Sequence, residues 1–231
     1  MLLDGGFLSV EANPGMIELV IAHIGEFFSG FKITLVIALG AMLGGSLLGV
    51  LTAIFRLSRV GPLRMLSLSY IELIRNTPGL VQLLLVYLGL PEFGIRFSPL
   101  GATILALTIN NGAYLAEIFR AGLQSVPKGQ LEAAAAIGLP RTATLIDVVL
   151  PQALLAIYPA LTNQFIQTVL FSSIGALIGT VELTQVALIL NTQTYRTIEI
   201  LAALSLMYVG ISAVIASASH RLGVRLERRY H

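Results

Sequence analysis

Ser125-Val-Pro-Lys-Gly-Gln-Leu-Glu132-Ala-Ala-Ala-Ala-Ile-Gly138 is a stretch of low hydrophobicity that lies between two hydrophobic segments. Pro127 suits the first turn of a helix, where its missing N–H would have no intrahelical partner. Gly138, with Pro140 beyond it, is typical of a helix end. The pattern therefore predicts a helix of about three turns over residues 127–138, joining two membrane segments. Taken alone, it could be a plain connector, because Glu and Ala are strong helix formers.

The composition of the whole chain indicates a membrane protein. Of its 231 residues 56% are hydrophobic and 11% are charged, and the mean hydropathy is +0.87. Soluble domains carry about 25% charged residues. Runs without Asp, Glu, Lys or Arg fall at 33–55, 76–91, 97–116, 148–181 and 200–219. Because a spanning helix needs about 20 apolar residues, the sequence predicts an all-α polytopic protein with about five transmembrane helices.

Two of these runs do not have the length of a single span. The run at 76–91 is short, but residues 66–71 can extend it toward the membrane surface. The run at 148–181 is too long for one span, so we expect a span broken near Ser172 to Gly175. A shorter or re-entrant helix carrying Glu182 should follow it.

The positive charges predict the orientation of the chain in the membrane. Cytoplasmic loops are enriched in Lys and Arg. If five spans alternate, ten of the fourteen Lys and Arg residues fall on one side: Arg56, Arg59, Arg64, Arg120, Lys128, Arg141, Arg221, Arg225, Arg228 and Arg229. We expect an extracytoplasmic segment at 1–31 and a cytoplasmic helix at 127–138. A basic cytoplasmic tail at 221–231 would contact lipid headgroups, so the net charge of +2 reflects orientation and not nucleic-acid binding.

Several functional classes lack the residues they need. Cysteine is absent, and neither lysine belongs to a phosphate-binding loop, so nucleotide would have to bind a partner. No His/Cys pattern indicates a metal site. An integral membrane hydrolase with a buried serine is disfavoured, because His23, His220 and His231 lie outside the spans or at their ends. The first 31 residues hold no Lys or Arg and so lack a basic signal-peptide opening; we expect the first span to be retained.

Polar residues within or beside the spans are the candidate site residues. Glu72 with Arg75, and Glu117 with Arg120, have i,i+3 spacing and predict structural ion pairs at the membrane boundary, in preference to substrate contacts. In the fourth span a polar stripe should face protein or water, since unpaired polar groups in lipid are costly. It is a candidate lining for a translocation path, with interhelical hydrogen bonding as the alternative: Asn163, Gln164, Gln167, Thr168, Ser172 and Ser173.

Glycines in the first span indicate close helix packing. They form two small-xxx-small patterns, Gly40 with Gly44 and Gly45 with Gly49. Such patterns allow another helix to approach closely, although glycine is also generally frequent in membrane helices. The sequence leaves both interpretations open.

Three segments together resemble a known family. The spacing of Glu132-Ala-Ala-x3-Gly138-x9-Val148-x-Leu150-Pro151 is similar to the EAA motif of permease subunits in ABC importers. Arg75-x-Thr-Pro78-x-x-Val-Gln82 and the stretch Asn110–Arg120 resemble polar amino-acid permeases. The resemblance implies one transmembrane permease domain over 1–231, with a type I importer fold, in a bacterial inner membrane.

The resemblance also implies partners and roles. Glu132, Ala133, Ala134 and Gly138 would couple the chain to a cytoplasmic ABC ATPase dimer, which would bind ATP and Mg. This chain would bind no cofactor and would not be an enzyme. A solute-binding protein outside the membrane would deliver a polar amino acid, and two permease subunits would transport it by alternating access. An ATP-independent channel or secondary carrier remains the alternative, but it leaves the helix at 127–138 unexplained.

One departure from the family concerns the second permease subunit. Many relatives place a Lys, often followed by an acidic or hydroxyl residue, before the Ser pair equivalent to Ser172-Ser173. This chain has Leu170-Phe171 there. We therefore expect a heterodimer, in preference to a homodimer, whose partner permease supplies most of the charged contacts.

Overall fold

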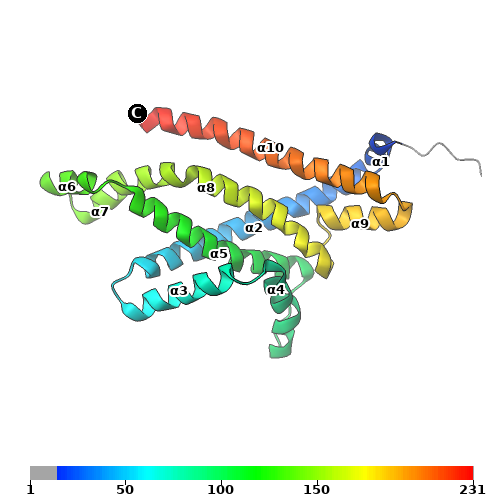
Figure 1. The fold of residues 1–231 in the computed structure, drawn as a ribbon, viewed down its shortest axis with the longest axis horizontal. Helices are drawn as coiled ribbons and strands as arrows, with labels where there is room; N and C mark the ends of the chain where they lie inside the picture. The colour runs from blue at the N-terminus through cyan, green and yellow to red at the C-terminus, as the bar shows by residue number, and fades with distance from the viewer. Residues whose placement is uncertain (1–14, 231) are drawn as a thin grey trace, which may run out of the picture.

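The computed structural model describes residues 15–230, with side chains to residue 225, and these residues form helices and short connections without strands. The longest helices run along the molecule (Figure 1). In chain order the elements are α1 (Met16–Ala22), α2 (Ile24–Leu57), α3 (Gly61–Arg75), α4 (Gly79–Leu84), the π-helical η1 (Leu85–Gly89), the 3-10 helix η2 (Leu90–Phe93), α5 (Pro99–Ser125), α6 (Lys128–Ala136), α7 (Arg141–Ala143), the π-helical η3 (Thr144–Val149), α8 (Leu150–Phe171), the 3-10 helix η4 (Ser172–Ile178), α9 (Leu183–Thr194) and α10 (Thr197–Tyr230).

Within the part of the chain that the structure describes, three helical stretches are long and apolar enough to cross a membrane. They are α2, the continuous helical stretch Arg141–Ile178, and α10 over Thr197–Arg225. The bent pair Gly61–Arg75 and Gly79–Phe93 adds a fourth if it is counted as one span. α5 is long enough, at 27 residues, but Asn110 and Asn111 lower its hydropathy. It packs against α2, α3, α4 and α8, so its polar side faces protein. The prediction of an all-α membrane protein is confirmed.

The described parts of the two expected terminal segments, 1–31 and 221–231, are helical. Of the predicted extracytoplasmic segment 1–31, residues 1–14 lie outside the described part. The remainder is helical, since α1 is followed by α2 from Ile24, about two turns before the expected start of the first span. At the other end, α10 continues as a helix through the predicted tail to Tyr230.

The first span packs closely on α5 through its glycines. A Cβ at Gly45 would lie 2.6 Å from the Cβ of Asn111, and one at Gly49 would lie 2.9 Å from the Cβ of Leu115. Real Cβ atoms do not approach so closely, so only glycine permits this separation. The interpretation of a tight helix contact is confirmed, and the contact lies within one chain.

The second predicted span is not straight. α3 and the helical stretch Gly79–Phe93 meet at an angle of 105°. Pro78 has no N–H, so it cannot continue the hydrogen-bond ladder of α3. The side chain of Gln82 replaces the missing donors: its Nε2 donates to the carbonyls of Ile74 at 2.8 Å and Thr77 at 3.0 Å. The break therefore has a fixed geometry.

The fourth span ends as the sequence predicts. α8 stops at Phe171, η4 follows, and Glu182 begins α9 as its N-cap. The Glu182 side chain is fully buried and accepts from the backbone N–H groups of Thr184 at 2.9 Å and Gln185 at 3.0 Å. The hydroxyls of Tyr208 and Thr34 also donate to it, at 3.0 Å and 3.4 Å. This one carboxyl group joins α2, α9 and α10.

Candidate functional site

A polar cavity of about 520 Å³ lies where the α3–α4 break meets α5 and α8. We call it the upper cavity, because it lies farther from α6 along α5 and α8 than the second cavity described below. Leu107, Asn110, Asn111 and Tyr114 contribute from one face of α5, because residues at i, i+3, i+4 and i+7 project on the same side of a helix. Its lining consists of Arg75, Asn76, Thr77, Pro78, Gly79, Leu107, Asn110, Asn111, Tyr114, Gln164, Gln167, Thr168 and Phe171.

Amide groups hold the walls of the upper cavity in place. Asn111 Oδ1 accepts from Gln164 Nε2 at 2.7 Å and from the Thr168 hydroxyl at 3.0 Å, which joins α5 to α8. Asn110 donates to Gln82 Oε1 at 3.0 Å, which joins α5 to α4. Asn111 is 3% exposed and its Nδ2 has no hydrogen-bond partner. A buried donor without a partner is costly, so among the described residues this amide is an unsatisfied group in the wall of the cavity.

The predicted ion pair between Glu72 and Arg75 is not formed. Glu72 instead accepts from the side chain of Asn76 at 2.9 Å. The Arg75 guanidinium carbon lies 5.3 Å from the centre of the Tyr114 ring, a cation–π distance. At the end of α3, close to the break, Arg75 contacts α5 and lines the cavity. The i,i+3 spacing allows the ion pair but does not require it, and Arg75 contacts the Tyr114 ring on another helix instead.

The second predicted ion pair is present. Arg120 Nη2 lies 2.6 Å from Glu117 Oε2, and Arg120 Nε lies 3.1 Å from the same oxygen. Both residues line a second cavity of about 530 Å³, the lower cavity, between α5 and α8. Its remaining lining residues are Arg75, Tyr114, Ile118, Ala121, Gly122, Ser125, Ala156, Ile157 and Ala160.

The polar stripe predicted in the fourth span divides into three parts. Gln164, Gln167 and Thr168 line the upper cavity. Asn163 lies in a separate crevice of about 240 Å³ between α8 and α10.

The two serines of the stripe lie apart from the upper cavity. Ser172 is fully buried and donates to the Val169 carbonyl at 2.8 Å, while Ser173 donates to the Leu170 carbonyl at 2.7 Å. Both serines satisfy the backbone at the end of α8. Whether any of these residues contacts substrate remains a prediction.

Some lining residues could have been found from the sequence. Leu107, Asn110, Asn111 and Tyr114 follow the i, i+3, i+4, i+7 spacing of one helix face. Arg75 and Gly79, in contrast, reach the cavity only because the chain bends at Pro78. Their position depends on the tertiary fold and has no periodic signal.

The short helix expected at 127–138 is α6, and it ends in a defined turn. Gly138 has a φ of +74°, and the N–H groups of Gly138 and Leu139 donate to the carbonyls of Ala135 and Ala134, both at 3.0 Å. This is a Schellman ending, which favours glycine at the positive φ.

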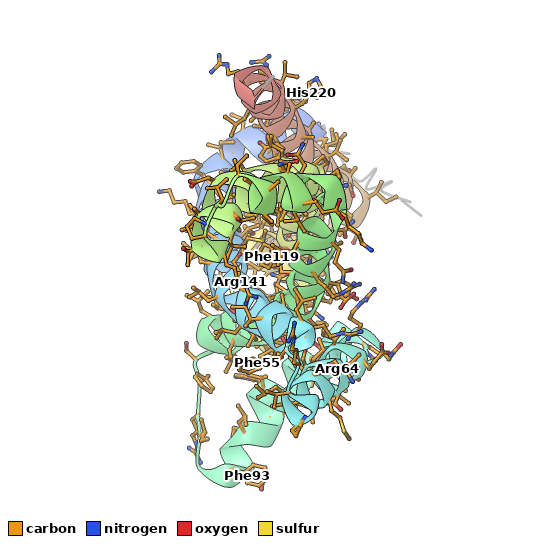
Figure 2. All side chains as sticks on the ribbon, turned by 90° about the vertical axis from the view of Figure 1, so that its left-hand side faces the viewer. Phe55, Arg64, Phe93, Phe119, Arg141 and His220 are labelled. Atoms are coloured by element: carbon orange, nitrogen blue, oxygen red, sulfur yellow. The ribbon has the colours of Figure 1, made fainter. Side chains whose placement is uncertain are left out.

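α6 is almost entirely exposed. Within it, Ala134 alone is buried; Glu132 is exposed, and Ile137, which caps the helix, is 77% exposed. α6 lies at one end of the molecule, beyond the ends of α5 and α8 (Figure 1). Figure 2 looks at this end, at which Arg64 of α3 and Arg141 of α7 are labelled.

Together, the fold and the site define a class of membrane protein, the helical transporter component. Its polar cavity is lined by α5, and α5 leads to the exposed helix α6 outside the spans. Residues 45–231 match the model of the family described as binding-protein-dependent transport system inner membrane component. The chain belongs to this family and is a membrane-spanning permease subunit. The alternatives of a channel, a secondary carrier or a hydrolase are not favoured.

Relatives cover nearly the whole chain. The probable glutamine ABC transporter permease protein GlnM of Bacillus subtilis (strain 168) is 33% identical over 214 residues, which cover 93% of this chain and 99% of GlnM. The probable glutamine ABC transporter permease protein GlnP of the same organism is 36% identical over 208 residues, or 88% of this chain and 94% of GlnP.

Solved structures of transporters have a similar fold. A crystal structure of an amino acid ABC transporter with histidines superposes with a TM-score of 0.84 and 37% identity, covering 89% of this chain and 96% of the other. An inward-facing structure of the MetNI methionine ABC transporter shares the fold, with a TM-score of 0.67 at 22% identity over 91% of this chain and 97% of the other.

Proposed function

We propose that this permease subunit transports polar amino acids into the cell, as one half of a translocation path driven by a separate ATPase. The observation that carries the proposal is the course of α5. Its polar face lines the upper cavity at Asn110, Asn111 and Tyr114, and the same helix continues to Ser125, three residues before α6 begins at Lys128. A movement of α6 therefore reaches the cavity through one unbroken helix.

The chemistry of the upper cavity suits a polar amino acid. Arg75 supplies a positive charge, and Gln167 supplies an exposed amide donor, both of which complement a carboxylate or an amide oxygen. A volume of about 520 Å³ lies within the range of small-molecule sites. The names of the relatives, which refer to glutamine and amino acids, agree with this class of substrate.

The second permease subunit is expected to supply further charge. Where many relatives place a Lys, this chain has Leu170-Phe171. Phe171 lines the upper cavity, and a Cβ on Gly79 would fall 2.1 Å from the end of its ring. An aromatic ring therefore fills this part of the path. This supports a heterodimer whose other permease provides the charged contacts.

The orientation follows from the positions of basic residues. Arg64, Arg120, Lys128 and Arg141 lie in segments at the end of the molecule that carries α6 (Figures 1 and 2). We place this end in the cytoplasm, with the N-terminus outside and the C-terminus inside. α6 then stands where an ATPase can contact its exposed surface through Glu132, Ala133 and the turn at Gly138, while Ala134 packs inward.

The first experiment is purification of the tagged chain from its native membrane in mild detergent, with identification of co-purifying subunits by mass spectrometry. We expect a P-loop ATPase and a second, similar permease. The complex in liposomes, with its solute-binding protein, should take up labelled glutamine or another polar amino acid only with ATP and Mg. A stable preparation without an ATPase would contradict the proposal.

Two substitutions test coupling through α6. Gly138→Val should abolish most ATP-driven uptake, because a β-branched residue is strained at a φ of +74°. Gly138→Asn is the matched control, since Asn tolerates this region and no atom lies within 4 Å of a Cβ at this position. Glu132→Arg should reduce co-purification of the ATPase. Normal uptake by Gly138→Val at normal abundance would rule out the coupling role.

A further inference from the structure

The upper and lower cavities meet at two side chains. Of the residues lining each cavity, Arg75 and Tyr114 alone line both. Their side chains are also in contact, with the Arg75 guanidinium 5.3 Å from the centre of the Tyr114 ring. A solute that passes from the upper cavity toward the α6 end along this chain must pass this contact.

We infer that Arg75 and Tyr114 form a cation–π gate between the two cavities, and that this gate must open for substrate to leave toward the α6 end. The inference rests on the proposed function, because it takes the two cavities to be successive parts of one translocation path.

The Arg75 side chain is held by no ion pair with another described residue, so it can rotate. Its guanidinium forms none of the ion pairs in the described residues, and its side chain is exposed. The predicted partner Glu72 bonds to Asn76 instead. The contact with Tyr114, together with a longer-range attraction from Glu117, therefore keeps the guanidinium over α5, and a cation–π contact is weak enough to be broken repeatedly.

The helices on which the pair is mounted are fixed to one another. The Tyr70 hydroxyl donates to the Ile109 carbonyl at 2.6 Å, which joins α3 to α5 five residues before Arg75 and five before Tyr114. Separation of the two helices would break this bond. The gate therefore opens by rotation of the long Arg75 side chain, while the backbones stay together.

The acid that lines the lower cavity is already paired with another arginine. Among its lining residues Glu117 is the one acid, and its carboxylate is bound by Arg120 at 2.6 Å. Arg120 also donates to Gln124 at 2.6 Å, which fixes the pair along α5. Glu117 still attracts Arg75 at longer range, but because Arg120 binds its carboxylate, the Arg75 guanidinium stays over Tyr114 until substrate displaces it.

The chain has no cysteine, which permits a direct test of access. Gln167→Cys places a thiol in the upper cavity, and Ala156→Cys places one in the lower cavity on the same helix. The full complex, in inside-out vesicles without nucleotide, is treated with a charged, membrane-impermeant maleimide. Labelling is measured as a mass shift of this chain alone.

We expect the thiol at position 156 to react quickly and the thiol at position 167 slowly. Adding Arg75→Ala or Tyr114→Leu should raise the labelling rate at position 167 about fivefold, because each removes the cation–π contact. Tyr114→Phe keeps the ring and should leave the rate unchanged. Labelling at position 156 should stay the same throughout, which shows that the variants remain folded.

Two results would overturn the gate: equal labelling rates at positions 156 and 167 in the otherwise unsubstituted chain, or no increase at 167 with Arg75→Ala and Tyr114→Leu. Labelling needs no transported solute, so it can support the gate even if ATP-driven uptake of glutamine by the unsubstituted complex fails. That second measurement tests the proposed function separately.

Discussion

The two sides of α5 are built in different ways. Toward α2 the helices are closely packed through glycines, with Gly45 against Asn111 and Gly49 against Leu115. Toward α3, α4 and α8 the contact is polar and encloses the upper cavity. One helix thus combines a surface with no room to move and a surface with space for a ligand. The difference teaches that fold and transport can be disturbed separately, and four substitutions test this separation.

The largest loss of stability is expected where α5 packs on α2. Gly45→Leu would place atoms within 2.6 Å of the Asn111 Cβ and 3.3 Å of the Gly112 backbone nitrogen. We expect a loss of about 3 kcal/mol or more, at the upper end of overpacking costs. The yield of monodisperse protein and its thermal transition measure the effect. Gly210→Leu is the control, because no atom lies within 4 Å of a Cβ at Gly210, and equal behaviour of the two variants would contradict the close contact.

The next effect extends the packed side to α9 and α10. Glu182→Ala leaves two backbone N–H groups and the Tyr208 and Thr34 hydroxyls without their common acceptor. Each unsatisfied buried group costs about 1–3 kcal/mol, and relaxation of the helix end reduces the total, so we expect a loss of roughly 3 kcal/mol. Thermal unfolding in detergent measures it. Glu182→Gln keeps an acceptor and should lose less; a stable Glu182→Ala variant would show that this junction is not structural.

On the polar side, Gln82→Leu should affect transport more than stability. It removes the donors that bind the Ile74 and Thr77 carbonyls and the acceptor for Asn110. We expect about 1–2 kcal/mol of destabilisation and a several-fold loss of uptake, because the α3–α4 break would lose its fixed geometry. Uptake per folded complex, measured in liposomes, separates the two effects. Normal uptake would mean that Pro78 alone determines the bend.

The smallest effect on stability is expected at Gln167. Its side chain lines the upper cavity and forms none of the recorded side-chain hydrogen bonds, so Gln167→Ala should leave the thermal transition within about 0.5 kcal/mol of the parent. We expect a higher KM for uptake. Ser173→Ala is the matched control, because Ser173 bonds to the Leu170 carbonyl and does not line the cavity. A larger change in KM at Ser173 would reverse the assignment of lining residues.

The fold could be predicted largely from hydropathy and helix ends, whereas the site could be predicted only in part. The helix at 127–138 depends on local signals, Pro127 at its start and Gly138 at its end, and the structure contains it as α6. The structure also contains the predicted break after Phe171. The 105° bend at Pro78 could not be obtained from periodicity, because its angle depends on Gln82 and on packing against α5. The partner of Arg75 could not be predicted for the same reason: Glu72 is near in sequence, but Tyr114 is near in space.

The volume of the upper cavity has a consequence for water. About 520 Å³ corresponds to on the order of 15 water molecules, at about 30 Å³ each. A substrate that enters must expel many of them, and a path that closes around the substrate must expel the rest. Each transport cycle therefore moves a volume of solvent as well as a solute. Solutes too large to enter the cavity, which draw water out of it osmotically, should change the rate of the cycle without touching the protein.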